Sequence, residues 1–125
     1  MIFKQLSGIV KVEIDCRRAY SQLIDVSIKF TPTNLNQTLI FPKWTPGSYT
    51  IRDHAKNVYS LRLSQGLKPI DLNRILSNKW TYILNSLDPV IINYTVIANE
   101  FTVRTNYIES NFASLCLSSL IILVE

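Results

Sequence analysis

Histidine and cysteine are scarce in this sequence. Among 125 residues it has one histidine, His54, and two cysteines, Cys16 and Cys116. A lone histidine without a second titrating group at a defined spacing is usually a surface or packed side chain. Two cysteines so far apart form neither a disulfide framework nor the Cys-x-x-Cys pair of zinc and redox sites. We therefore expect two reduced, mostly buried thiols and no cofactor bound by this chain.

Charge of one sign is nowhere concentrated, and long apolar runs are few. The 13 Lys and Arg against 9 Asp and Glu give a net charge of +4, but the basic residues are scattered. Nucleic-acid-binding proteins cluster them, so we expect no nucleic-acid partner. The N-terminus lacks the apolar centre of a secretory signal, and the apolar stretch 112–124 is shorter than the roughly 20 residues of a spanning helix. We predict a cytoplasmic protein without membrane contact.

What the sequence does have is alternation of apolar and polar residues over most of its length. Such alternation predicts half-buried strands, and the turn residues between these stretches favour an antiparallel arrangement. The fold predicted is all-β, an antiparallel β-sandwich of one domain over residues 1–110, followed by a divergent apolar tail, 111–125, that we expect to be a strand. The residues expected to face the core are Val10, Val12 and Ile14; Ile24, Val26, Ile28 and Phe30; Tyr59, Leu61 and Leu63; Trp80, Tyr82 and Leu84; and Ile92, Tyr94 and Val96.

One long loop interrupts the strand pattern, from about residue 42 to residue 56. Residues 41–58 read FPKWTPGSYTIRDHAKNV, with two prolines and a glycine among them. Loops of this length are uncommon in compact domains and often functional. Trp44 is either a packing plate or a contact surface. Arg52 and Asp53 either form a local ion pair or face a ligand. In both cases we favour the structural role.

This loop resembles a family signature, P-x-W-x-P-G-S-Y-x-I-R-D-x-A-x-x-V, in the N-terminal domain of the M61 family of zinc aminopeptidases, the glycyl aminopeptidase type. A second segment, YTVIANEFTVRTNYIES at residues 94–110, resembles the stretch at the end of that domain, which ends in V-R-T-x-Y. The likeness covers roughly positions 9–109.

The resemblance implies a β-sandwich that packs against a thermolysin-like catalytic domain, which a PDZ-type domain follows. In full-length members a His-Glu-x-x-His helix and a further glutamate bind zinc. That motif needs two histidines one helical turn apart, and this sequence has one in total. We therefore expect a non-catalytic fragment, truncated before the catalytic domain, with zinc only in a full-length family member. The resemblance makes six residues candidates for the substrate cleft or the domain interface: Trp44, Tyr49, Arg52, Asp53, Arg104 and Tyr107.

Three hypotheses about function remain. The first is a non-catalytic M61 N-terminal domain that shapes the substrate cleft of a separate catalytic domain. The second is a stand-alone β-sandwich module that binds a protein or peptide. The third, an enzyme of another class using Tyr49, Asp53 and His54, has no supporting motif. The sequence departs from the family after Glu109, and a truncated gene, a frameshift or a short paralogue would explain the departure. The apolar tail either adds as a strand to its own sheet or pairs with the sheet edge of a second copy, and we favour a homodimer.

Overall fold

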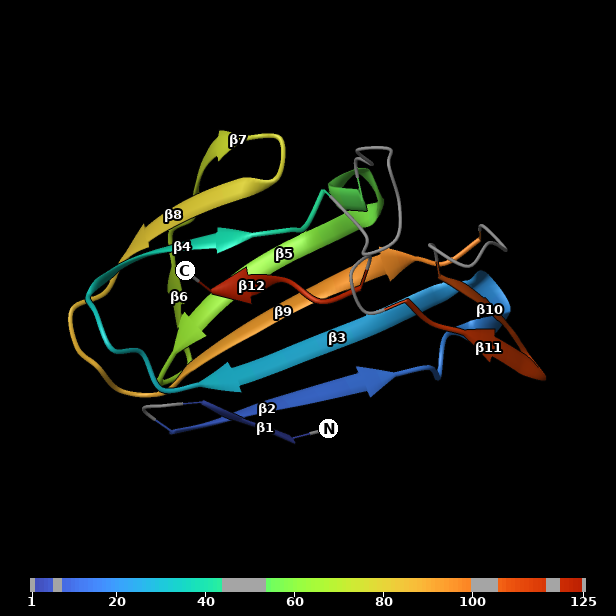
Figure 1. Ribbon diagram of the computed structural model, residues 1–125, viewed down its shortest axis with the longest axis horizontal. Helices are drawn as coiled ribbons and strands as arrows, with labels where there is room; N and C mark the ends of the chain where they lie inside the picture. Colours follow the sequence, from blue (N-terminus) through green and yellow to red (C-terminus); the bar gives the residue numbers. More distant parts are fainter. Residues whose placement is uncertain (1, 6–7, 44–53, 100–105, 117–119, 125) are drawn as a thin grey trace.

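Two antiparallel sheets face each other across one apolar core (Figure 1). The computed structural model describes residues 2–5, 8–43, 54–99, 106–116 and 120–124. This part of the chain forms an all-β sandwich, as the alternation predicted. No helix within it is long and apolar enough to cross a membrane.

The larger sheet has six strands and the smaller sheet has four. In spatial order the larger sheet consists of β1 (Ile2–Gln5), β2 (Gly8–Asp15), β3 (Leu23–Phe30), β9 (Val90–Ile97), β5 (Val58–Gln65) and β6 (Lys68–Ile70). The smaller sheet consists of β12 (Leu123–Val124), β4 (Asn36–Ile40), β8 (Lys79–Ile83) and β7 (Asn73–Leu76). A hairpin, β10 (Tyr107–Glu109) with β11 (Phe112–Ser114), and two short 3-10 helices, η1 (Ala19–Ser21) and η2 (His54–Asn57), complete the described elements.

The core lies between the sheets and follows the predicted alternation. On β3 and β9 every second side chain is buried, because successive side chains of a strand point to opposite faces. Trp80 and Tyr82 bury their side chains from the smaller sheet, and Leu84, which follows β8, is buried too. The rings of Phe41 and Tyr94 meet edge to face, with their centroids 6.2 Å apart.

One predicted core residue, Tyr59, lies on the opposite face. Tyr59 pairs with Thr95 and Arg62 pairs with Asn93, so β5 holds one more residue than β9 between these pairs. The extra residue makes a β-bulge, in which Ser60 adopts a left-handed conformation with φ of 55°. The bulge turns Tyr59 to the outer face of the larger sheet, where half of it is exposed, while Leu61 and Leu63 pack on the core as predicted.

The C-terminal segment is part of the core. Leu120 and Ile122 are buried, and β12 adds to its own chain's sheet by pairing with β4. The buried hydroxyl of Tyr94 donates a hydrogen bond to the carbonyl of Leu120 (2.6 Å) and accepts one from the N–H of Ile122 (3.0 Å). One tyrosine of the central strand β9 therefore binds the segment through two hydrogen bonds. The predicted boundary at residue 110 and the homodimer stay predictions.

The predicted burial of the cysteines is wrong for Cys16. Both cysteines are free, but Cys16 is exposed and Cys116 is partly exposed. Cys16 directly follows the last residue of β2, where strand alternation no longer directs a side chain toward the core.

Candidate functional site

Five of the six predicted site residues lie outside the described part of the chain: Trp44, Tyr49, Arg52, Asp53 and Arg104. Most of the predicted loop lies outside it too, and the described remainder includes η2.

Tyr107 is the sixth predicted site residue, and it begins β10. Its hydroxyl donates a hydrogen bond to Oε2 of Glu109 (3.0 Å), and its ring packs at a tilt against Phe112, with centroids 6.4 Å apart. The hydrogen bond to Glu109 raises the pKa of Tyr107. These contacts fix Tyr107 on the β10–β11 hairpin, and its functional role stays a prediction.

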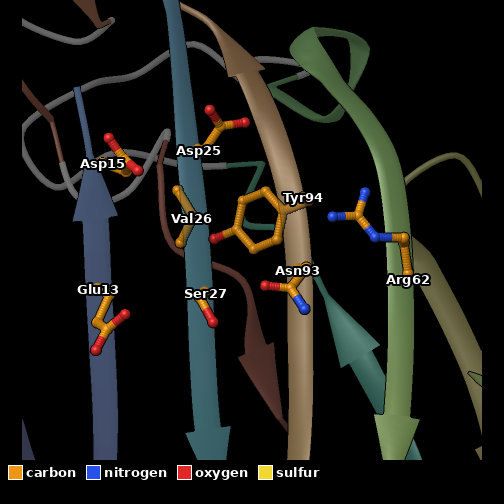
Figure 2. A pocket seen from close by; sticks show the side chains of 8 residues that line it. All are labelled: Glu13, Asp15, Asp25, Val26, Ser27, Arg62, Asn93 and Tyr94. Carbon is orange, nitrogen blue, oxygen red and sulfur yellow. The ribbon is translucent and has the colours of Figure 1, made fainter. Parts of the chain in front are cut away.

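The structure brings together a different group of polar residues, on the outer face of the larger sheet (Figure 2). They line a hollow of about 240 Å³. Strand register creates it: Glu13 on β2 lies opposite Ser27 on β3, Ser27 lies opposite Asn93 on β9, and Asn93 lies opposite Arg62 on β5. One polar row thus crosses four strands. The polar residues that line the hollow are Glu13, Asp15, Asp25, Ser27, Arg62 and Asn93, and Val26 and Tyr94, whose side chains are buried in the core, complete its lining.

Two carboxylates at one end of the hollow face each other across neighbouring strands. Asp15 and Asp25 are paired in the register of β2 and β3, and like charges in such a position destabilise a sheet. Each is neutralised from the turn after β2, where Arg17 Nε lies 2.8 Å from Asp15 Oδ2 and Arg18 Nε lies 2.8 Å from Asp25 Oδ2.

These pairs keep both carboxyl groups ionised. The hydrogen bonds from Arg17 lower the pKa of Asp15 to about 2. The hydrogen bond from Arg18, followed by one from the Thr95 hydroxyl (2.7 Å), lowers the pKa of Asp25. Both aspartates of the hollow are thus already paired with arginines. Among the described residues, no three His, Cys, Asp or Glu side chains are grouped to hold a metal ion.

The charged groups at the two sides of the hollow have much weaker partners. On β2, Glu13 pairs with Lys11 at 3.0 Å, and both side chains are more than half exposed, so the pair contributes little. On β5, Nη1 of Arg62 donates to the carbonyl of Ser60 (3.0 Å). Arg62 takes part in none of the ion pairs found in the described ranges.

The arginine pairs predict an acid dependence of stability. Both carboxyl groups have folded-state pKa values below the ordinary 3.8. Their contribution is therefore complete above about pH 4 and is lost as the pH falls toward about 2. We expect Arg18→Gln to lower the thermal midpoint at pH 7 and to flatten its fall between pH 4 and pH 2. Midpoints measured across this range test it, with Lys68→Gln, an exposed lysine on β6, as the charge-matched control. If the thermal midpoint of Arg18→Gln fell with pH in parallel with that of the unsubstituted chain, the predicted contribution of the Arg18–Asp25 pair would be contradicted.

The sequence matches the family model of the Peptidase M61 N-terminal domain over residues 11–125. The chain belongs to this family. The resemblance inferred from its two motifs is thereby confirmed. No match was found among curated proteins.

A matching solved structure is that of the aminopeptidase N family protein from Idiomarina loihiensis. It shares 30% sequence identity with this M61 N-terminal domain at a TM-score of 0.86. The match covers 93% of this chain and 20% of the other, so the chain spans about a fifth of that protein's length.

Proposed function

We propose that the chain is the non-catalytic N-terminal domain of an M61-like zinc aminopeptidase, which packs on a separate catalytic domain and shapes its substrate cleft. The observation that carries the proposal is the domain match over residues 11–125, together with the likeness to one fifth of a longer aminopeptidase N family protein. Because the match covers one fifth of that chain, we expect the partner of this domain to correspond to the other four fifths. The six residues named from the family motifs are the proposed contacts with that partner.

The chemistry of this chain supports a structural role. Zinc peptidases with a His-Glu-x-x-His helix bind the metal with two histidines and a further glutamate. This sequence has one histidine. The zinc would therefore be held by the catalytic partner. We propose that both act in the cytoplasm.

A mixing experiment tests the proposal. The Idiomarina loihiensis protein is expressed without the part that aligns with this chain, and the two polypeptides are mixed. We expect the chain alone to release no product from glycyl or alanyl substrates, with or without zinc. We expect it to bind the shortened protein saturably in calorimetry, and Tyr107→Ala to weaken that binding.

Tyr59→Ala is the matched control, since Tyr59 is another partly exposed tyrosine, on the larger sheet. Failure of the two polypeptides to associate, or equal binding by the two variants, would count against the interface. Zinc-dependent turnover by the chain alone that survives repurification and disappears in His54→Ala would refute a non-catalytic role.

A further inference from the structure

We propose that the polar hollow on the larger sheet binds a small zwitterion, with its carboxylate on Arg62 and its ammonium group on Glu13. This inference does not depend on a catalytic partner. Figure 2 shows the two residues at opposite sides of the hollow, with Glu13 on β2 and Arg62 on β5, whose side chain extends toward β9.

The bulge in β5 sets the position of Arg62. A β-bulge redirects the side chains that follow it, and Ser60 holds an unusual left-handed conformation for a residue other than glycine. The carbonyl of that same serine accepts a hydrogen bond from Arg62 Nη1. The guanidinium is therefore anchored at the side of the hollow through one of its five N–H donors, and its described contacts leave the others to face a ligand.

The charge distribution selects a molecule with two separated charges. A simple anion bound to Arg62 would leave the carboxylate of Glu13 facing it across the hollow. A simple cation would find the carboxylates of Asp15 and Asp25 already paired with arginines. Only Glu13, whose exposed pair with Lys11 is easily exchanged, remains to bind an ammonium group. A zwitterion satisfies Glu13 and Arg62 together.

The spacing of the strands limits the length of the molecule. β2 and β5 are three strand spacings apart, about 14 Å, and Arg62 extends from β5 toward the middle of the hollow (Figure 2). The space between the two charged side chains suits a molecule of roughly 7–10 Å, the length of a dipeptide or tripeptide at about 3.3–3.6 Å per residue. The hydroxyl of Ser27 and the amide of Asn93 line the hollow between the two ends, where they can bind neutral polar groups such as peptide linkages.

Titration of the full chain with triglycine, followed by amide NMR shifts, tests the site. We expect saturation in the millimolar range, with the largest shifts at Ser27, Asn93 and Arg62. N-acetyltriglycine lacks the ammonium group and triglycinamide lacks the carboxylate, so each should bind at least about tenfold more weakly, as expected for the loss of one charge-assisted contact. Equal binding of the three peptides, or no saturation by triglycine below about 50 mM, would overturn the proposal.

Two variants locate the ends of the ligand. Arg62→Gln and Glu13→Gln should each weaken triglycine binding at least about tenfold. Arg62→Gln should also abolish the preference for triglycine over triglycinamide. Glu13→Gln should abolish the preference for triglycine over N-acetyltriglycine. Lys68→Gln and Asp71→Asn make the same charge changes outside the hollow and should bind as the unsubstituted chain does. Retained affinity in both hollow variants, or equal loss in the controls, would refute the site.

Discussion

Tyr94→Phe is expected to lower the free energy of unfolding by about 1–3 kcal/mol and the thermal midpoint by roughly 5–10 °C. The hydroxyl of Tyr94 donates to the Leu120 carbonyl and accepts from the Ile122 N–H, in a buried environment. Burial raises the pKa of Tyr94, so the hydroxyl remains protonated at ordinary pH. Phenylalanine keeps the ring and its contact with Phe41 but leaves a buried carbonyl and a buried N–H without their partner.

Tyr20→Phe provides the control for this measurement. It removes the same oxygen atom from a tyrosine that is 78% exposed, where surface substitutions usually change stability by less than about 0.5 kcal/mol. Chemical denaturation of both variants gives the comparison. Equal stability of Tyr94→Phe and the unsubstituted chain would show that the two hydrogen bonds contribute nothing to holding the C-terminal segment.

Ending the chain after Ser110 is expected to abolish cooperative unfolding. The deletion removes Leu120 and Ile122, which are 0% and 3% exposed, and also removes β12 from the edge of β4. Loss of one large buried aliphatic side chain costs about 2–5 kcal/mol, and a domain of this size is stable by only about 5–15 kcal/mol. Calorimetry of the shortened chain should show no cooperative transition.

Leu123→Ser is the control within the same segment. Leu123 is 53% exposed on β12, so its substitution should leave the transition nearly unchanged. A shortened chain that unfolds cooperatively near the original midpoint would show that the segment is dispensable, as an added tail would be.

Alternation predicted the sandwich because the two-residue period of a strand is visible in the sequence. It placed the buried faces of β3, β8 and β9 correctly. It failed at Tyr59 because a bulge inserts one residue, and serine at position 60 gives no sign of a left-handed conformation. Alternation also could not predict the burial of Leu120 and Ile122. These two residues lie outside any strand and are buried through contacts with distant elements.

The polar hollow could not be predicted from the sequence, for a different reason. Apart from Val26 and Tyr94, its residues belong to the polar half of an alternating strand, which normally faces solvent. Only the register of four strands brings Glu13, Ser27, Asn93 and Arg62 into one row. The two family motifs pointed to other residues, and of the six that they named, the described structure includes Tyr107 on β10.

The place of β9 between β3 and β5 bears on how the chain folds as it is synthesised. β3 and β5 are made long before β9, yet both pair with it, and Leu23 lies opposite Ile97 in the finished sheet. Pairing between strands so distant in sequence is slow, because a large loop must close before any contact forms. Until β9 leaves the ribosome, β3 and β5 lack their common neighbour and present open strand edges. The growing chain is therefore most prone to aggregate before its central strand is complete.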